Sequence, residues 1–322
     1  MIQSLPLNIK VARTKRRIEE WISYNSVENT YLSHSGGKDS TVAYHILKEV
    51  NKNVPSVFCN TGLEQVSVVK QANKIEGLIT IRPSMNINQV ISKYGYPIIS
   101  KDVSLKIHKL RKQNLDPKYR NYLLNGDERG SFGTIPKEWQ YLINADFDIS
   151  NFCCDKLKKQ PFKMFEKKTG RIAKITGEIA DESRDRKEQY LKFGCNAFNK
   201  KSGIKSTPLG FWLENDILQY IYENDIEIAS VYGDIIIDYY KKLPSGEKVP
   251  QFKTTGESRT GCVACAFGLK YDCNRFLRLK EEHPSQYNYC INGGEYNKEG
   301  IWKPTKEGLG YSHILNYLGI PY

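Results

Sequence analysis

The sequence predicts an α/β protein built on a doubly wound parallel sheet, and two patterns carry this prediction. Strand-like and helix-like segments alternate along residues 27–94, and each helix-like segment has its apolar residues at helical spacing. Two glycines stand between the first strand and the helix that follows it, where the chain must turn sharply. This alternation is typical of parallel strands, because the crossover helix returns the chain to the end of the sheet from which the next strand starts.

The predicted elements follow one another with short connections. A basic amphipathic helix over residues 8–24 comes first, with Ile9, Val11, Ile18, Trp21 and Ile22 as its apolar face. Predicted after it are strands at 29–35, 54–62, 77–83 and 171–178, a return to the sheet at 203–212, and helices at 39–52, 64–75, 86–95, 180–194 and 214–225. Residues 95–150 are polar and less regular, and they predict helices and long loops over the sheet.

The composition changes near residue 225, after which cysteines occur at short spacing. We therefore predict three parts: an N-terminal basic helix (1–26), a nucleotide-binding domain (27–225) and a cysteine-containing C-terminal extension (226–322).

Composition favours a folded protein that is not inserted in a membrane. The 322 residues are 39% hydrophobic and 26% charged, which supplies a packed core. The sequence has no apolar run of ~18 residues and no secretory signal pattern, so we expect a cytoplasmic protein.

The charge balance is basic. The net charge is +12, with basic residues gathered at 10–17, 106–113 and 156–171. Such a balance suits a nucleotide or a nucleic acid as partner, although ordinary solvated helix faces would also account for it.

The stretch "SHSGGKDS" has the features of an anion-binding loop. Gly36 and Gly37 let backbone N–H groups approach an anion closely, and the helix that follows directs its positive end to the same place. Lys38 adds a full charge, and Ser35 and Ser40 add hydroxyl groups. The spacing fits neither a Walker A loop nor a dinucleotide-binding G-x-G-x-x-G loop. The alternative is a plain strand-to-helix turn.

This loop resembles the PP-loop of ATP pyrophosphatases in the adenine nucleotide alpha-hydrolase-like superfamily. Three further stretches resemble the phosphoadenosine phosphosulfate (PAPS) reductase family: "FCNTGLE" at 58–64, "ITGEIADESRDR" at 175–186 and "STPLGFWLENDILQYI" at 206–221. The resemblance covers roughly residues 27–225. It implies a doubly wound α/β domain that binds an adenine nucleotide at the carboxyl ends of its strands.

The resemblance also implies site residues. Phe58 and Thr61 are expected near the adenosine, and Arg184 and Arg186 at the phosphate or sulfate end, with solvated surface arginines as the alternative. The residues implied to bind the nucleotide are Ser35, Gly36, Gly37, Lys38, Asp39, Ser40, Phe58, Thr61 and Gly177, and those implied to act in catalysis are Lys38, Asp39, Arg184 and Arg186.

Eight cysteines in a protein of this kind favour metal or redox chemistry over disulfides. Cys153 and Cys154 are adjacent, and Cys262 and Cys265 form a C-x-x-C pair. Four thiolates without histidine suit an iron–sulfur cluster or zinc, and buried free thiols are the third alternative. The set resembles the cysteines that hold a 4Fe-4S cluster in adenylylsulfate (APS) reductases.

The remaining four cysteines and two of the histidines have other expected roles or positions. Cys195, Cys273 and Cys290 are candidates to replace a cluster ligand or to act as a nucleophile. Cys59 is expected in the core. His34 and His283 are expected to be polar surface residues, with a catalytic role as the alternative.

Three departures from the sulfonucleotide reductases of this family shift the expected activity. Those enzymes use a cysteine near the C-terminus as nucleophile, whereas no cysteine follows Cys290 here. Their loop usually lacks the lysine, and Glu178 stands where they tend to have arginine. Lys38 suits the β- and γ-phosphates of ATP, whose charge grows as pyrophosphate leaves.

The expected function is therefore cleavage of ATP between its α- and β-phosphates in a sulfur-transfer pathway, with Mg²⁺ and a 4Fe-4S cluster as cofactors. Thiolation of tRNA or phosphorothioation of DNA fits the basic surface, and a cysteine desulfurase would supply the sulfur. The first alternative is a PAPS or APS reductase that makes sulfite with a thioredoxin-like donor. The second is a nucleotide-binding subunit without catalytic activity. The sequence does not predict the oligomeric state.

Overall fold

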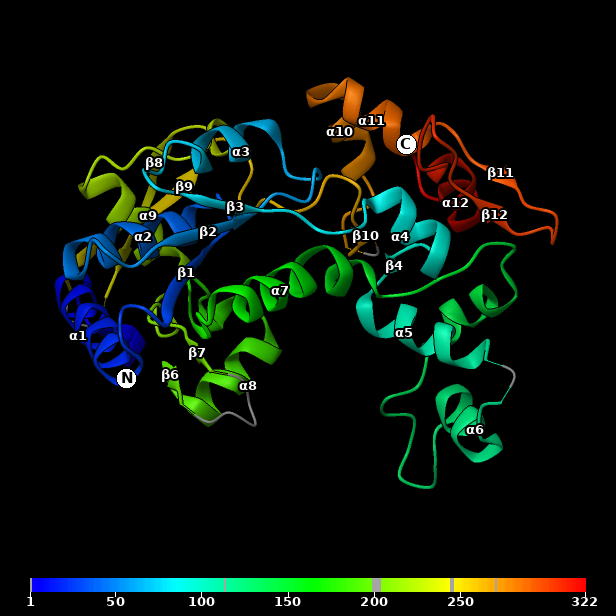
Figure 1. Ribbon diagram of the computed structural model, residues 1–322, viewed down its shortest axis with the longest axis horizontal. Coiled ribbons are helices and arrows are strands. Elements are labelled where there is room, and N and C mark those ends of the chain that lie inside the picture. Colours follow the sequence, from blue (N-terminus) through cyan, green and yellow to red (C-terminus); the bar gives the residue numbers. More distant parts are fainter. Residues whose placement is uncertain (1, 113, 199–203, 244–245, 270) are drawn as a thin grey trace. The chain divides into compact units, whose positions relative to one another are not determined.

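The structure is a computed structural model that describes residues 2–112, 114–198, 204–243, 246–269 and 271–322 (Figure 1). The chain forms two compact units, and both are discontinuous in sequence. The first unit comprises Met1–Asn60, Glu64–Arg82 and Pro161–Gly261, and the second comprises Thr61–Leu63, Pro83–Gln160 and Cys262–Tyr322.

The first unit contains the predicted sheet. Its strands lie in the order β3-β2-β1-β5-β7-β6, and all neighbouring pairs are parallel except β6 with β7. The strands are β1 (Thr30–His34), β2 (Ser56–Cys59), β3 (Ile79–Ile81), β5 (Ala173–Thr176), β6 (Asn196–Ala197) and β7 (Lys205–Ser206). The direction of the strand order reverses at β1, so that β2 and β5 flank it on either side. The expected α/β fold with a mainly parallel sheet is confirmed.

Helices cover both faces of the sheet. The helices of this unit are α1 (Leu7–Asn25), α2 (Lys38–Val50), α3 (Val66–Ala72), α7 (Gln160–Thr169), α8 (Arg184–Phe193) and α9 (Glu214–Glu223). Side chains alternate between the two faces of a strand, and in β1 both faces are buried because helices lie on each (Figure 1). Leu32 packs with Trp21 of α1, whereas Tyr31 packs with Phe165 of α7.

A buried ion pair ties α1 to α9. Lys10 Nζ lies 2.5 Å from Asp216 Oδ2, and that carboxylate also accepts a hydrogen bond from the Leu213 N–H at 2.6 Å. Asp216 therefore both caps the first turn of α9 and neutralises a lysine that is 1% exposed. Two members of the predicted apolar face of α1, Ile18 and Trp21, are fully buried, but Ile9 is 44% exposed.

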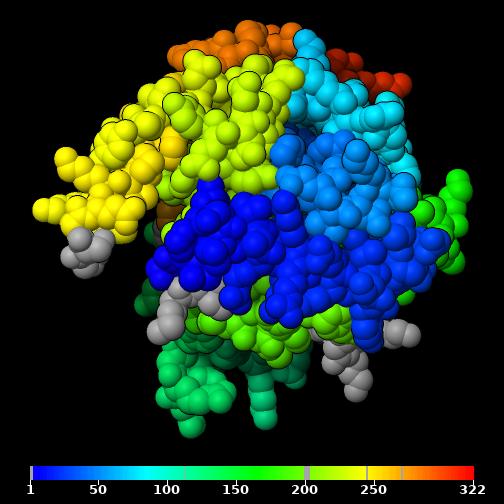
Figure 2. Space-filling model, turned by 90° about the vertical axis from the view of Figure 1, so that its left-hand side faces the viewer, coloured from blue at the N-terminus to red at the C-terminus, as the bar shows by residue number. Residues whose placement is uncertain are grey.

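A two-stranded antiparallel hairpin of β8 (Ile235–Lys242) and β9 (Lys248–Thr254) completes the first unit. It is joined to α9 through Asn215, whose side chain bonds the backbone of Pro250 and Phe252. Figure 2 shows the hairpin in yellow projecting from this unit beside the blue surface of α1.

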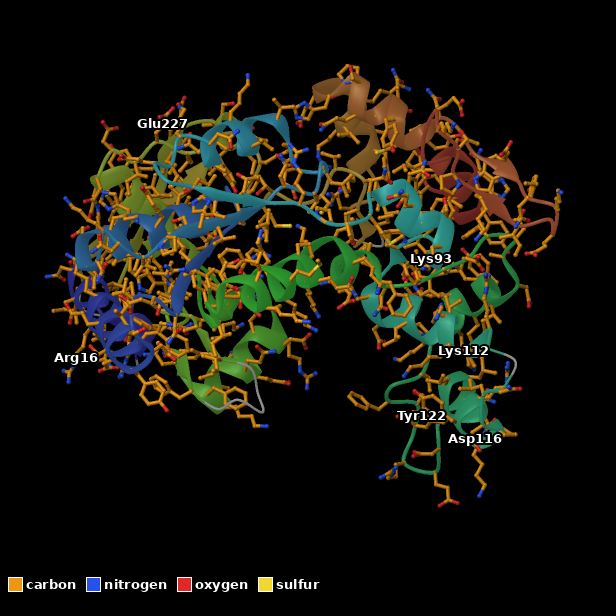
Figure 3. The ribbon with its side chains drawn as sticks, in the orientation of Figure 1. Arg16, Lys93, Lys112, Asp116, Tyr122 and Glu227 are labelled. Carbon is orange, nitrogen blue, oxygen red and sulfur yellow. The ribbon has the colours of Figure 1, made fainter. Side chains whose placement is uncertain are left out.

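The second unit has its own core. Its helices are α4 (Ile87–Tyr94), α5 (Lys101–Leu110), α6 (Pro117–Asn125), α10 (Arg275–Glu282), α11 (Pro284–Ile291) and α12 (Tyr311–Leu318). Its strand pairs are β4 (Ile98–Ile99) with β10 (Ala266–Phe267), and β11 (Glu295–Tyr296) with β12 (Trp302–Lys303). Tyr96, Phe147 and Tyr311 are all buried in this core, and the ring of Tyr96 contacts the other two. Lys112 and Asp116 mark the connection from α5 to α6 in Figure 3.

This division differs from the three parts predicted from the sequence. The basic helix 1–26 packs into the core of the first unit, because its buried residues Ile18 and Trp21 lie in the same cluster as Leu32. The irregular stretch 95–150 forms a core together with the C-terminal residues. The predicted bounds 1–26, 27–225 and 226–322 stay a prediction about which segments fold independently. In the described residues, no helix is both long and apolar enough to cross a bilayer.

Candidate functional site

The glycine loop occupies the carboxyl end of the central strand. β1 ends at His34 and α2 begins at Lys38, so Ser35, Gly36 and Gly37 form the whole turn. Gly36 has a φ of +76°, and a Cβ placed on it would lie 2.6 Å from Cγ1 of Val68. Neither the backbone angle nor the space allows another residue, so the close turn requires this glycine.

The backbone N–H groups of the loop donate hydrogen bonds to side chains. Three consecutive N–H groups donate to side-chain acceptors: Gly36 to His34 Nδ1 (3.0 Å), Gly37 to Ser35 Oγ (3.3 Å) and Lys38 to the Tyr232 hydroxyl (3.2 Å). The hydroxyls of Ser40 and Thr41 donate to the Gly37 carbonyl at 2.8 and 3.1 Å. Donors at the start of a helix are those that bind phosphate oxygens. An anion at this loop would compete with the hydroxyls of Ser35 and Tyr232.

The Lys38 ammonium is buried beside the loop between two carboxylates. It lies 2.8 Å from Glu214 Oε1 at the start of α9 and 3.3 Å from Asp39 Oδ1, and the side chain is 3% exposed. Burial alone would lower the pKa of Lys38, but Asp39 and then Glu214 outweigh it and raise the pKa above its ordinary value. Lys38 therefore carries a full positive charge at neutral pH.

Asp39 is the second charged residue of the loop, and its carboxyl is partly buried. Burial raises the pKa of its carboxyl, and the charge of Lys38 offsets only part of this effect. Apart from the ion pair with Lys38, Oδ1 is buried and accepts no hydrogen bond within the described residues. An oxygen in this position is suited to a bound cation.

Tyr232 and Glu214 belong to the site although no local pattern indicated them. The ring of Tyr232 lies under the Lys38 ammonium at 5.6 Å, and its hydroxyl bonds Thr260 Oγ1 at 3.0 Å. Both residues reach the loop from far along the chain, and only the folded first unit brings them there.

His34 is a core residue, and its expected surface position is wrong. It is 2% exposed, and burial lowers the pKa of its imidazole to about 4. Because Nδ1 accepts the bond from Gly36, the proton of the neutral ring sits on Nε2. His34 thus buttresses the loop from the end of β1.

The other expected nucleotide residues differ in their positions. A Cβ on Gly177 would lie 2.7 Å from the Asp39 carbonyl oxygen, so the end of β5 packs directly on the start of α2. Phe58 is buried in β2 beside β1. Thr61 belongs to the second unit, where its hydroxyl accepts a hydrogen bond from the Leu63 N–H at 3.2 Å.

The two expected arginines differ in their distance from the loop. Arg184 points into solvent, since its side chain is 82% exposed and pairs with Glu188. Arg186 pairs with Glu182, and its charge offsets a small part of the rise that burial causes in the pKa of Asp39. Of the two, Arg186 is therefore the one near the loop.

The four expected metal ligands gather in the second unit. The Sγ atoms of Cys153 and Cys154 are 3.9 Å apart, and the N–H of Cys265 donates to the Cys262 carbonyl at 3.0 Å within the C-x-x-C turn. The hydrogen bond to Cys154 and burial raise the pKa of the Cys153 thiol, and the thiols of Cys265 and Cys262 raise it further. The thiols of Cys262 and Cys265 therefore act electrostatically on the thiol of Cys153.

Lysine charges act on one of these thiols. The hydrogen bond from Cys153 lowers the pKa of the Cys154 thiol, and Lys101 and Lys158 lower it further against the opposing effect of burial. In the described ranges, no three histidine, cysteine or acidic side chains converge closely enough to hold a metal ion as they stand. The donor set nevertheless fits an iron–sulfur cluster, because four thiolates with neighbouring lysines match an anionic centre bound only by sulfur.

The remaining cysteines are dispersed. Cys59 is buried in β2, as expected, and Cys195 is buried in the first unit. Cys273 is exposed, and Cys290 is buried on α11. Burial raises the pKa of Cys195 to about 11 and that of Cys290 to about 12.

Comparison with protein families finds a match to the phosphoadenosine phosphosulfate reductase domain over residues 29–115 and 128–266. Among curated proteins, the uncharacterized protein MJ0973 of Methanocaldococcus jannaschii is 23% identical over 267 residues. That alignment covers 81% of this chain but 46% of MJ0973, so the chain spans about half the length of this relative.

Three solved structures show a distant likeness. The PAPS reductase of Candida auris in a phosphate complex has a TM-score of 0.39 and 16% identity, covering 66% of this chain and 82% of that one. The NH3-dependent NAD synthetase of Campylobacter jejuni has a TM-score of 0.36 and 10% identity, covering 70% and 76%. The U34-tRNA thiolase NcsA of Methanococcus maripaludis, with its 4Fe-4S cluster, has a TM-score of 0.38 and 13% identity, covering 87% and 76%. With TM-scores below 0.5, these likenesses carry no statement about function.

Proposed function

Because the chain belongs to the phosphoadenosine phosphosulfate reductase domain family, we propose that it is an enzyme that binds ATP at the loop of residues 35–40 and cleaves it between the α- and β-phosphates. The observation that carries this proposal is the buried, charged ammonium of Lys38 beside the loop. Pyrophosphate gains negative charge as it leaves, and a cation fixed at that place stabilises it.

Phosphate oxygens can replace the side-chain hydroxyls that accept hydrogen bonds from the N–H groups of the loop. Phosphate would displace the hydroxyls of Ser35 and Tyr232 from the N–H groups of Gly37 and Lys38. The start of α2 directs its positive end to the same oxygens. The Lys38 ammonium would turn from Glu214, which is partly exposed and regains solvent when released.

The reaction that follows is an adenylyl transfer. An oxygen of the acceptor attacks the α-phosphorus, and the bonding electron pair to the bridging oxygen leaves with pyrophosphate. Asp39, whose Oδ1 accepts no hydrogen bond within the described residues beside its ion pair with Lys38, is the residue that would hold Mg²⁺, which neutralises phosphate charge when bound.

The sulfur-transfer step is proposed for the second unit. Cys153, Cys154, Cys262 and Cys265 would hold a 4Fe-4S cluster, which supplies a site for binding or activating sulfur. A cysteine desulfurase would deliver the sulfur as a persulfide, a thiol reductant would release it as sulfide with formation of a disulfide, and attack of that sulfide on the activated acceptor would expel AMP.

The family name also supports a second candidate, reduction of PAPS or APS with a thioredoxin-like donor. That reaction needs a thiolate nucleophile, and the two buried candidates, Cys195 and Cys290, both have a raised pKa. A protonated buried thiol is a weak nucleophile, so the structure offers less support for this reaction.

The two reactions are separated by their products. Anaerobically purified protein is incubated with ATP, Mg²⁺ and tRNA or DNA as acceptor, and in parallel with PAPS or APS plus thioredoxin. Pyrophosphate release that is lost in Lys38→Met supports the proposal, whereas sulfite formation would replace it with the reductase. Nucleotide binding without either product would indicate a non-catalytic subunit.

The cluster has a test of its own. Protein prepared without oxygen should be brown and absorb broadly near ~400 nm. Cys262→Ala should lose this absorbance, and Cys273→Ala should keep it, because the exposed Cys273 is not one of the four assigned ligands. A colourless protein that carries one zinc ion would contradict the iron–sulfur assignment.

A further inference from the structure

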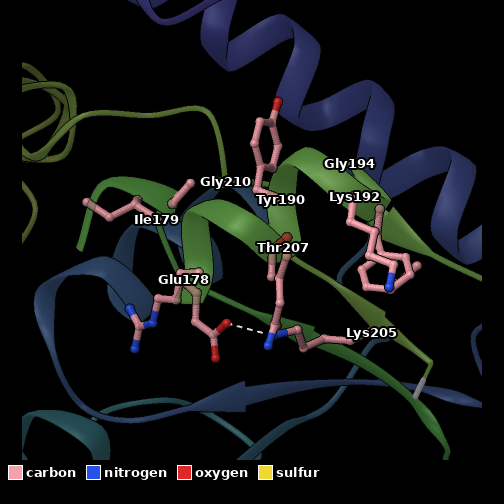
Figure 4. A pocket seen from close by; sticks show the side chains of 13 residues that line it. Glu178, Ile179, Tyr190, Lys192, Gly194, Lys205, Thr207 and Gly210 are labelled. Carbon is pink, nitrogen blue, oxygen red and sulfur yellow. Dashed lines mark hydrogen bonds and ion pairs between the residues drawn. The ribbon is translucent and has the colours of Figure 1, made fainter. Parts of the chain in front are cut away.

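A cavity of about 550 Å³ in the first unit lies along α8 (Figure 4). Its lining side chains come from the end of β5, from α8 and from the segment around β7, and they include the labelled Glu178, Tyr190, Lys192 and Lys205. Among the described residues that line the cavity, Glu178 is the single carboxylate, and it is paired with Lys205 at 2.7 Å. The cavity therefore has an excess of positive charge.

A second hollow of about 240 Å³ adjoins the first. The two hollows share Tyr190, Phe193 and Gly194 in their linings, so the aromatic side chains of α8 stand between them. The smaller one adds Arg13 and Arg17 from α1, together with further aromatic side chains, Phe198 and Phe211.

Together the two hollows interleave cations with aromatic rings. The cationic side chains are Arg13, Arg17, Arg186, Lys192 and Lys205, and the aromatic ones are Tyr190, Phe193, Phe198 and Phe211. Two of the arginines have carboxylate partners, Glu20 for Arg17 and Glu182 for Arg186, but neither acid lines a hollow. The acids therefore reduce the positive charge without placing a negative group at the surface that a ligand would meet.

The larger hollow also adjoins the phosphate loop. Its lining begins at Glu178, directly after Gly177, which packs on the Asp39 carbonyl. Arg186 lines it as well, and its charge acts on Asp39. A ligand in this hollow would lie next to a nucleotide on the loop.

We propose that these two hollows, the Tyr190 channel, bind a single strand of nucleic acid as the acceptor of the enzyme. One unpaired base would stack in the larger hollow and the next in the smaller, on either side of Tyr190 and Phe193, with Arg13, Arg17 and Lys192 at the phosphates. Binding of a single strand in the channel does not depend on the function proposed above, whereas the role of that strand as acceptor rests on it.

The chemistry of the channel favours this occupant. Aromatic rings alternating with cations are how proteins hold single strands, because every base offers a π-face and every linkage a negative charge. A duplex keeps its bases stacked and paired, so it cannot place them in concave hollows. An acidic peptide would use the cations but would leave the aromatic faces without flat partners.

Binding is measured by fluorescence anisotropy with labelled 12-nucleotide DNA and RNA, single-stranded and duplex, over a range of salt concentrations. Tyr190→Ala should weaken single-strand binding at least about fivefold, and Tyr190→Phe should restore most of it, because stacking needs the ring and not the hydroxyl. Tyr222→Ala is the matched control, since Tyr222 is an exposed tyrosine on α9 outside the channel.

Charge variants test the same site without changing its packing. Lys192→Gln and Arg13→Gln should each lower the slope of log affinity against log salt by about 0.7. The controls are Lys187→Gln on α8 and Arg16→Gln on α1, neither of which lines a hollow. Figure 3 shows Arg16 directed away from α1 at the surface. These control variants should bind like the parent protein.

Three results would overturn the inference: equal affinity for single strand and duplex, an unchanged affinity in Tyr190→Ala and Lys192→Gln, or equal competition by a poly-glutamate peptide of matched length. Pyrophosphate release from ATP is measured on the same parent protein with and without the single-stranded oligonucleotide. Its absence in both cases, with strand binding intact, would defeat the proposed function and leave the channel standing. The reverse result would defeat the channel alone.

Discussion

Replacing Lys38 by methionine removes one charge from the loop and keeps an unbranched side chain in its place. Lys38 is 3% exposed, whereas the side chains of its partners Asp39 and Glu214 are 21% and 38% exposed. Removing one partner of a fully buried ion pair costs about 3–5 kcal/mol. Because Glu214 can regain water and the pKa of Asp39 is already raised, we expect the free energy of unfolding to fall by only ~2 kcal/mol.

The effect on the reaction should be larger than the effect on stability. A preorganised group that meets developing charge contributes about 10²–10³ in rate, so kcat for pyrophosphate release should fall by that factor. This corresponds to ~3–4 kcal/mol in the activation barrier. The affinity for ATP should fall less, because binding in the ground state already exchanges Glu214 for phosphate.

The assay combines urea unfolding, followed by tryptophan fluorescence, with pyrophosphate release at saturating ATP. Lys52→Met, on the exposed turn after α2, is the control and should leave both quantities unchanged. Glu214→Gln added to Lys38→Met should recover part of the lost stability but none of the rate. A folded Lys38→Met protein with a kcat within about threefold of the parent would refute the role of Lys38.

Three further predictions concern the residues around the loop and the core. Tyr232→Phe should raise ATP affinity about 2- to 10-fold in calorimetric titration, because the free protein loses the bond to Lys38 N–H that phosphate must displace; weaker binding would show that the hydroxyl contacts the nucleotide instead. The free energy of unfolding should decline as pH falls from 6.5 towards 4, by up to about 3 kcal/mol, because only the unfolded chain protonates His34 in this range; urea unfolding of His34→Gln at pH 7 and pH 5 should show a smaller decline, and an equal one would contradict the account. Asp216→Asn should lower the free energy of unfolding by about 3–5 kcal/mol in urea titration, because it leaves Lys10 buried without its charge partner; Asp238→Asn on the exposed hairpin is the control, and an equal loss there would argue against burial as the cause.

Local sequence patterns were sufficient for the elements of the sheet. The predicted strands at 29–35, 54–62, 77–83 and 171–178 each contain an observed strand. The reason is that a short apolar run between turn residues is typical of a strand buried in a sheet. The loop of residues 35–40 was also visible, since two glycines before a helix are a local feature. What local patterns missed was burial of polar groups, as at His34 and Lys10.

The sequence by itself determined the α/β fold, the position of the loop between β1 and α2, and the presence of a C-C and a C-x-x-C motif. Only the tertiary structure decided that Glu214 and Tyr232 contact Lys38, that Gly177 packs on Asp39, and that the C-x-x-C thiols act on the thiol of Cys153. The reason is physical. Turns and amphipathic segments are set by neighbours in the chain, whereas charge pairing and burial depend on which distant segments the core brings together.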